Sequence, residues 1–277
     1  PLVVKNMTDP QLYQLPYLVI RGMTVATIIA FYLFFNEGLN FVKKLFQIDG
    51  VTIIGGMSLT TAFLGFIYSI SYTTAAVTLF MLALMPFLAS ILAFIFLSEK
   101  ISLQNLISMF IAFIGTLVMI YASTFSGSFF GLFMGFISSL GFSAFTVALR
   151  SKSDFKKFYI IIYAGIFCAI ISILLMIFHG QNFYLPFKNI GLSIIHGCIV
   201  ASGLILFSIG SKQLLSGELT MLSLLEVVGG IFWAWLPIFG INEVPSTNTI
   251  IGGFFLFVSI FYYSLIMRWN KRYIALN

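Results

Sequence analysis

Long apolar segments separated by short polar breaks run through the whole sequence. The clearest pair is residues 75–97 and residues 101–121, which are separated only by Ser98, Glu99 and Lys100. Each segment has about the ~20 residues that an α-helix needs to cross a hydrocarbon layer of roughly 30 Å. The pattern therefore predicts a membrane hairpin.

A similar layout returns near the C-terminus. Residues 219–239 and 249–267 are apolar and flank a short connection that holds Glu243 and Pro245. The acidic residue at the join and the apolar segments beside it match the first hairpin. We therefore expect an internal duplication, with a first repeat over residues 1–124 and a second over residues 125–277.

Five further apolar segments predict spans of their own. They cover residues 17–35, 51–70, 129–149, 158–178 and 190–209. The segment at residues 1–7 resembles the end of a span, so we expect most of the first helix to be truncated. The predicted fold is an all-α polytopic membrane protein of two inverted five-helix repeats, with ten helices in the complete protein and about nine full spans in this chain.

The composition supports a membrane protein. The chain is 60% hydrophobic and only 8% charged, whereas soluble domains have roughly 25% charged residues. The formal net charge of +6 comes from residues at the ends of the apolar segments, so it predicts topology and no nucleic-acid partner. Cys168 and Cys198 lie in separate apolar segments, so we expect no disulfide, metal site or cofactor.

The basic residues also predict an orientation. With the C-terminus in the cytoplasm, 11 of the 14 Lys and Arg residues are cytoplasmic and Lys5, Arg21 and Lys188 are not. This is the asymmetry of the positive-inside rule. The eleven are Lys43, Lys44, Lys100, Arg150, Lys152, Lys156, Lys157, Lys212, Arg268, Lys271 and Arg272. We therefore expect a multi-pass protein of the cell (inner or plasma) membrane, with two oppositely inserted halves around a midplane site.

Glu226 is the least expected residue in this pattern. It lies about eight residues inside an apolar helix that begins near Gly217, which is roughly 12 Å at 1.5 Å per residue. An ionised carboxylate at such a depth costs roughly 2.5 kcal/mol or more, so it should face the bundle interior, be protonated or have a partner. A structural carboxylate bonded to a neighbouring helix is the alternative.

Two further polar residues could act with Glu226 in coupling. Arg21 is about one turn inside its predicted span, where it either snorkels to the interface or faces a cavity. His196 lies in another span, as a hydrogen-bonded packing residue or as a proton carrier.

Aromatic and hydroxyl groups on facing helices could complete a substrate cavity. Pro86, in the middle of residues 75–97, removes a backbone hydrogen bond that a kink or a neighbouring polar group must compensate. Its kink is either harmless or shapes the cavity. The predicted cavity residues are Tyr68, Tyr72, Thr78, Pro86, Ser143, Ser202, Ser223 and Glu226.

Several short motifs carry a family resemblance. They are YTTAA at residues 72–76, LMPF at 84–87, SEK at 98–100, LE at 225–226, WAW at 233–235 and EVPS at 243–246. With these motifs the chain resembles the drug/metabolite transporter superfamily, EamA type. Val227 is a departure, because that family often has proline after the acidic residue of the ninth helix.

The resemblance implies ten helices in two inverted repeats. It also implies transport of small metabolites, amino acids or drugs through a central cavity, with export as the direction. From the residues we expect alternating access, with proton exchange at Glu226 as a further hypothesis. The expected partners are a small-molecule substrate and the lipid bilayer, with a homodimer as one option.

Two other classes of function are left open. A membrane enzyme acting on lipid-linked substrates should cluster several carboxylates, histidines or metal ligands, and the isolated acids and two histidines predict no such cluster. A non-transporting interaction protein is the third class, although the sequence has no sizeable soluble domain for that purpose. We therefore predict a transporter and not an enzyme.

Overall fold

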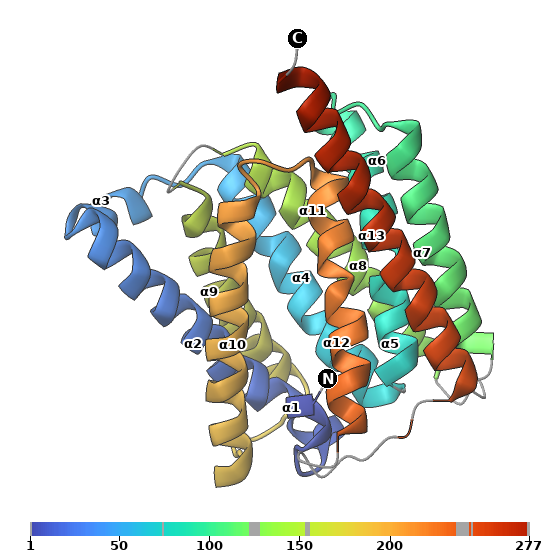
Figure 1. Cartoon of the computed structure of the whole chain (residues 1–277). Helices are drawn as coiled ribbons and strands as arrows, with labels where there is room; N and C mark the ends of the chain where they lie inside the picture. The colour runs from blue at the N-terminus through green and yellow to red at the C-terminus, as the bar shows by residue number, and fades with distance from the viewer. Residues whose placement is uncertain are drawn as a thin grey trace.

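The computed structural model describes residues 2–73, 75–121, 128–152, 156–236, 244 and 246–275, and all regular elements of this part are helices (Figure 1). The helices are α1 (Leu2–Lys5), α2 (Pro10–Glu37), α3 (Asn40–Leu45), α4 (Gly50–Tyr72), α5 (Ala75–Leu82), α6 (Met85–Leu97), α7 (Leu103–Tyr121), α8 (Phe129–Arg150), α9 (Lys156–Phe178), α10 (Phe187–Gly210), α11 (Ser216–Ser223), α12 (Leu225–Trp235) and α13 (Thr247–Ala275).

The predicted polytopic membrane fold is confirmed. Within the described residues, seven helical spans are long and apolar enough to cross a membrane, and one of them comprises α5 and α6 together. Helix α7 adds a shorter apolar segment, and α11 and α12 follow each other as two pieces. Every predicted span therefore corresponds to a helix or to a broken pair of helices. Glu243 and Pro245 lie outside the described residues.

The start of the first predicted span was wrong. Helix α2 begins at Pro10, seven residues before the expected start at Tyr17. Proline at the first helical position lacks an N–H that would have no partner there anyway, so it starts a helix well. Arg21 is therefore eleven residues into α2, roughly 17 Å at 1.5 Å per residue, and not one turn inside.

The span predicted over residues 75–97 is interrupted at Ala83 and Leu84, just before Pro86, and hydroxyl groups of a neighbouring helix bond backbone carbonyls beside the interruption. Ser143 of α8 donates a hydrogen bond to the Met85 carbonyl at 3.1 Å, and Ser139 donates one to the Met81 carbonyl. In lipid a freed backbone group needs such a partner. These two bonds lie on either side of the interruption; the carbonyl that Pro86 leaves without its helical donor is that of Leu82, so its compensation by a polar neighbour stays a prediction.

A matching interruption separates α11 from α12 without any proline. Leu224 donates to the Met221 carbonyl at 3.2 Å and Val227 donates to the Leu224 carbonyl at 3.0 Å, so the helix tightens locally into shorter-range hydrogen bonds. In each broken span the first piece has eight residues. This correspondence supports the predicted duplication, whose boundaries stay a prediction.

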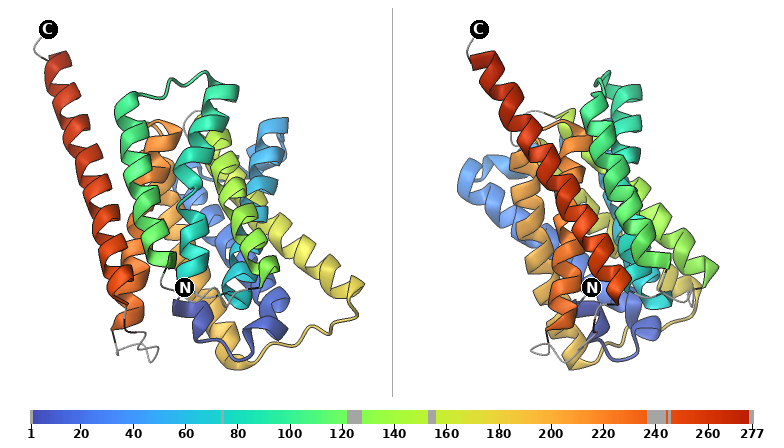
Figure 2. Two further views of the ribbon diagram at one scale, coloured as in Figure 1. Left: turned by 90° about the vertical axis from the view of Figure 1, so that its right-hand side faces the viewer. Right: turned by 45° about the vertical axis from the view of Figure 1, so that its right-hand side comes forward.

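The buried apolar residues form two main clusters that do not follow the two sequence halves. One cluster joins α1, α2, α4, α8, α9 and α10, called the first bundle below. The other joins α5, α6, α7, α11, α12 and α13, called the second bundle. Each bundle therefore mixes helices from before and after residue 125. Figure 2 shows α13 beside α7, with which it makes many contacts.

Glycines bring helices of the first bundle into backbone contact. A Cβ atom added at Gly165 of α9 would lie 2.5 Å from the Gly22 carbonyl oxygen of α2. In the same way, a Cβ atom at Gly65 of α4 would lie 2.6 Å from the Met134 carbonyl oxygen of α8. Small residues permit this approach where lipid gives no hydrophobic drive to pack helices.

We expect Gly165→Ala to lower the free energy of unfolding by about 1–3 kcal/mol, because the added methyl group meets rigid backbone. Unfolding in detergent measures the effect. Gly203→Ala on α10 is the matched control, since a Cβ atom there meets nothing within 4 Å. If both substitutions lowered the free energy of unfolding equally, the close backbone contact between α9 and α2 would be contradicted.

Hydrogen bonds between distant connections place them at two ends of the bundle. One end, called the basic end, holds residues 38–49, 98–102, 150–152 and 211–215; here Tyr159 donates to Glu37 at 2.7 Å, and Lys152 pairs with Asp49. At the other end, Thr8 donates to the Asn189 side chain at 3.0 Å. The predicted topology likewise places each of these sets of connections at one end of the bundle. The side of the membrane that each end faces stays a prediction.

Candidate functional site

A buried polar stripe runs along α2. Gln14, Tyr17 and Arg21 are spaced three and four residues apart, so they share one face of the helix. Only 6%, 0% and 3% of their surfaces are exposed. Within the described residues, Gln14 Oε1 and the Nε and Nη1 atoms of Arg21 have no hydrogen-bond partner. Buried polar atoms without partners are rare in folded proteins, so the stripe calls for a functional explanation.

Close helix packing holds the Arg21 side chain in the interior. Cβ atoms added at Gly22 of α2 or Gly197 of α10 would meet the backbone of α9 or of α2 at 2.7 Å and 3.1 Å. The guanidinium carbon lies 4.4 Å from the centre of the Phe63 ring of α4. This contact attracts the cation but supplies no hydrogen bond. Of the two expectations for Arg21, the structure therefore favours the interior charge over the snorkelling one.

His196 joins this stripe from α10. Its Nδ1 atom lies 2.7 Å from the Tyr17 hydroxyl, and both side chains are buried. His196 also interacts electrostatically with Arg21. His196 therefore makes a hydrogen bond, as expected of a packing residue, and it also lies next to the polar stripe of α2.

Glu226 belongs to the second bundle. It lies in the first turn of α12, directly after the interruption at Leu224, and its surface is accessible. Its carboxyl group interacts electrostatically with Arg21, although no hydrogen bond or ion pair joins it to the described part of the chain. Gly229 lies one turn further on the same face, and a Cβ atom there would meet nothing within 4 Å.

The structure therefore places Arg21 and His196, two of the three predicted coupling residues, together with Tyr17 in one cluster of α2 and α10, whereas no hydrogen bond or ion pair of the described residues joins Glu226 of α12 to it. Their role in coupling stays a prediction. Gln14, Tyr17 and the Phe63 ring were missing from the predicted site. The spacing of Gln14, Tyr17 and Arg21 could have revealed the stripe, had residues 10–16 been read as helix.

Several predicted cavity residues make contacts that hold helices together. Thr78 is fully buried, and its hydroxyl lies 3.0 Å from those of Ser69 and Thr73. Ser143 donates to the carbonyl of Met85, the residue before Pro86, beside the interruption between α5 and α6. These hydroxyls are occupied in this structure, so a direct contact with a solute stays a prediction.

The other predicted cavity residues are spread over three helices. Tyr68 and Tyr72 stack with ring centres 6.4 Å apart, near the end of α4. Ser202 donates to the Cys198 carbonyl at 2.9 Å within α10, and Ser223 donates to the Thr220 carbonyl at 2.6 Å within α11. Their role as cavity residues also stays a prediction.

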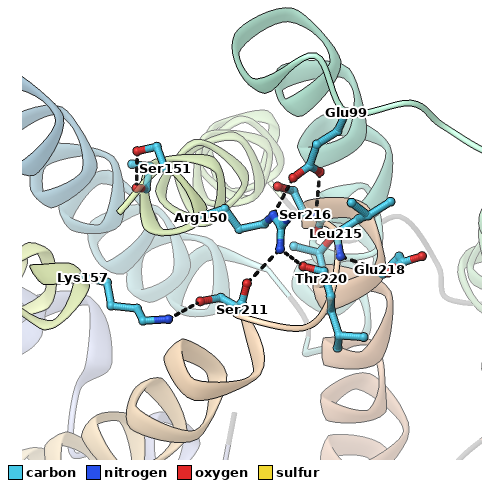
Figure 3. Close-up of polar contacts among 11 residues, drawn as sticks. Glu99, Arg150, Ser151, Lys157, Ser211, Leu215, Ser216, Glu218 and Thr220 are labelled. Atoms are coloured by element: carbon cyan, nitrogen blue, oxygen red, sulfur yellow. Dashed lines mark hydrogen bonds and ion pairs between the residues drawn. The ribbon is translucent and has the colours of Figure 1, made fainter. Parts of the chain in front are cut away.

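A second polar cluster closes the basic end (Figure 3). Arg150, the last residue of α8, lies 2.5 Å from a carboxylate oxygen of Glu99 and donates to the carbonyls of Ser211 (2.8 Å) and Leu214. The other oxygen of Glu99 accepts the N–H of Ser216 at 2.9 Å, at the start of α11. One arginine from the first bundle thus binds the end of α6 and the start of α11 in the second.

Lys157 extends this network on the first-bundle side. Only 2% of its surface is exposed, and its Nζ atom donates to the Ser208 carbonyl at 2.7 Å and to the Ser211 hydroxyl at 3.0 Å. The sequence marked Lys157, Arg150 and Glu99 as residues at the ends of spans. Their pairing joins segments far apart in the chain, so no local pattern could indicate it.

Asp49 lies at the same end, and the contribution of its contacts to stability depends on pH. Its side chain caps α4 by accepting the Thr52 N–H at 2.8 Å, and it pairs with Lys152. The hydrogen bond from Lys152 is the main cause that lowers the pKa of Asp49 to about 2, aided by Thr52. A carboxyl group whose pKa is lower in the folded state stabilises the fold above its ordinary pKa and loses this contribution as the pH falls towards 2.

We expect Asp49→Asn to lower the melting temperature at neutral pH and the difference from wild type to shrink between about pH 5 and pH 2. Asparagine keeps the capping oxygen, so the substitution removes only the charge. The effect is at most about 1 kcal/mol because the ion pair is exposed. Asp9, which makes no side-chain capping bond to α2, supplies the control Asp9→Asn. A difference independent of pH would contradict the contact with Lys152.

The fold and the buried charged cluster define a polytopic α-helical membrane protein with an internal polar site. Residues 3–121 match the model of the EamA-like transporter family, which confirms the resemblance seen in the sequence and, at the level of the family, a membrane transporter. A solved crystal structure, described only as that of a protein, superposes with a TM-score of 0.72 over 96% of this chain and 90% of that chain at 16% identity, which shows a shared fold. No functionally curated protein matches the sequence.

Proposed function

We propose that this protein is an alternating-access carrier of a small organic solute, with its solute site at Arg21, His196 and Glu226. The observation that carries the proposal is the buried polar stripe of α2, where Gln14 Oε1 and the Nε and Nη1 atoms of Arg21 have no hydrogen-bond partner within the described chain. Ionisable groups inside a membrane protein are costly and typically serve transport.

We propose that the two bundles, and not the two sequence halves, are the units that move. Each bundle has its own apolar core, and both cores contain helices from both halves. The network around Arg150 ties the bundles together at the basic end, so access to the site from that end requires these bonds to break. Breaking and remaking such contacts is how a bistable interface alternates.

Export and proton exchange at Glu226 complete the proposal. Export rests on the family resemblance, and proton exchange rests on a carboxyl group inside the membrane domain. A homodimer, residence in the cell membrane and a cytoplasmic C-terminus stay predictions of the sequence.

Uptake by proteoliposomes tests the carrier function. The full chain is reconstituted, and a panel of labelled small metabolites is offered under outward and inward pH gradients. We expect at least one solute to accumulate chemically unchanged, above the level in protein-free liposomes. If a correctly folded preparation accumulates none of them, or if it converts a solute to another compound, the carrier proposal is wrong.

A further inference from the structure

The connector between α2 and α4, residues 38–49, presents an apolar face at the outer edge of the basic end (Figure 1). Leu39 and Phe46 flank α3 and keep its right-handed helical conformation. Together with Val42 they are spaced three and four residues apart, so the three side chains share one face. Their surfaces are 74%, 78% and 41% exposed. A contiguous apolar face of this kind marks a contact with a membrane or a partner.

The opposite face of α3 fixes the connector to the first bundle. Phe41 and Leu45 pack against the apolar core of that bundle, and Tyr163 of α9 donates a hydrogen bond to the Leu45 carbonyl. Tyr159, one turn earlier in α9, donates to Glu37 at 2.7 Å. Because these contacts hold one face of α3, its exposed face keeps a fixed direction, away from the first bundle.

The exposed face continues the lipid-facing surface of α2. This helix is long and apolar enough to cross a membrane, and Phe34 and Phe35 near its end are 42% and 81% exposed. The ring centres of Phe34 and Phe41 are 6.4 Å apart, so α3 lies directly beside the end of the span. A short helix there lies at the depth of the lipid headgroups, where its apolar side chains reach the acyl chains.

The charged residues of the connector leave one exposed cation. Glu37 pairs with Lys44 at 2.9 Å, and Asp49 pairs with Lys152. Lys43 is exposed, and no ion pair joins it to another residue in the described part of the chain. Its position in α3 places it on the exposed apolar face. An exposed cation beside an apolar face is the combination that binds anionic lipid surfaces.

We propose that residues 38–49 are an interfacial anchor, which inserts Leu39, Val42 and Phe46 among lipid acyl chains and binds an anionic phospholipid headgroup through Lys43. The charge of Lys43 selects an anionic lipid over a zwitterionic one, because the headgroup supplies the negative charge that the described chain does not. The proposal concerns a surface remote from the solute site and does not depend on the carrier function.

Lipid binding by the purified full chain tests the role of the charge. The protein in detergent is titrated with phosphatidylglycerol or with phosphatidylcholine, and native mass spectrometry counts the bound lipids. We expect phosphatidylglycerol to bind more tightly, and Lys43→Gln to weaken its tightest binding about fivefold, the effect of one lysine near an anionic surface. Lys100→Gln is the matched control, since Lys100 is an exposed lysine of the basic end outside the connector. It should leave this binding nearly unchanged.

Fluorescence quenching tests the insertion of the apolar face. Phe46→Trp is reconstituted into phosphatidylglycerol vesicles that contain a phospholipid brominated near the headgroup or at the chain end. The wild type, with its three tryptophans, supplies the background signal. We expect the added indole to be quenched more strongly by bromine near the headgroup than at the chain end, because an interfacial helix lies at that depth.

The inference is overturned if phosphatidylcholine binds as tightly as phosphatidylglycerol, or if Lys43→Gln and Lys100→Gln weaken binding equally. It is also overturned if neither brominated lipid quenches the added indole. Absence of quenching together with a dimer in the mass spectrum would assign the face to a second copy of the chain. Lys43 and Phe46 are exposed, so both variants should unfold like the wild type, and thermal unfolding checks this.

Discussion

Replacing Arg150 with glutamine should lower the free energy of unfolding by about 3 kcal/mol. The substitution leaves Glu99 without its cation and removes the donor of the Ser211 and Leu214 carbonyls. The side chains of Arg150 and Glu99 are only 20% and 11% exposed, so water replaces these bonds poorly. A partly buried carboxylate that loses its partner costs far more than a surface ion pair.

Equilibrium unfolding of the reconstituted protein measures this effect. Lys100→Gln is the matched control, because Lys100 follows Glu99 directly and is exposed, so its loss should change stability by no more than about 0.5 kcal/mol. Adding Glu99→Gln to Arg150→Gln should cost less than the sum of the single effects, since both remove one interaction. Equal costs for Arg150→Gln and Lys100→Gln would show that the network does not hold the basic end.

Replacing Glu226 with glutamine should reduce solute uptake roughly tenfold to a hundredfold, because a hydrogen bond to a charged group contributes about 1.5–3 kcal/mol. The same substitution should leave the unfolding free energy nearly unchanged, since Glu226 bonds to no described residue. A loss of transport without a loss of stability distinguishes a solute contact from a structural carboxylate.

Uptake into proteoliposomes measures this at several pH values. Asp9→Asn is the control, because Asp9 is an exposed acidic residue at the start of α2. If Glu226→Gln keeps both the wild-type rate and the wild-type pH dependence, Glu226 has no role in proton exchange. If Glu226→Gln unfolds as easily as Arg150→Gln, the carboxyl group is structural.

The boundaries of the spans were largely predictable because they depend on local hydrophobicity. Lipid offers no partners to backbone groups, so an apolar segment of sufficient length must be helical whatever its neighbours are. Helices α8, α9 and α10 therefore begin and end within a few residues of the predicted positions. The position of Glu226 inside an apolar helix was evident for the same reason.

The start of α2 could not be predicted in this way. Pro10, Pro16 and the polar residues around them indicate a break when they are read as a local pattern. In the structure residues 14–16 are buried among other helices, and this packing keeps the segment helical. The missed turns contain Gln14, which is why the polar stripe of α2 became visible only in three dimensions.

By itself, the sequence determined that this chain is a polytopic helical membrane protein with a carboxyl group inside one span, because both properties follow from the order of apolar and polar residues. Only the tertiary structure decided that His196 lies with Tyr17 and Arg21, that Arg150 pairs with Glu99, and that each apolar core mixes the two halves. Helices that are apolar on every side can pack in many ways, so the choice among these arrangements depends on glycine contacts and polar pairs between distant segments.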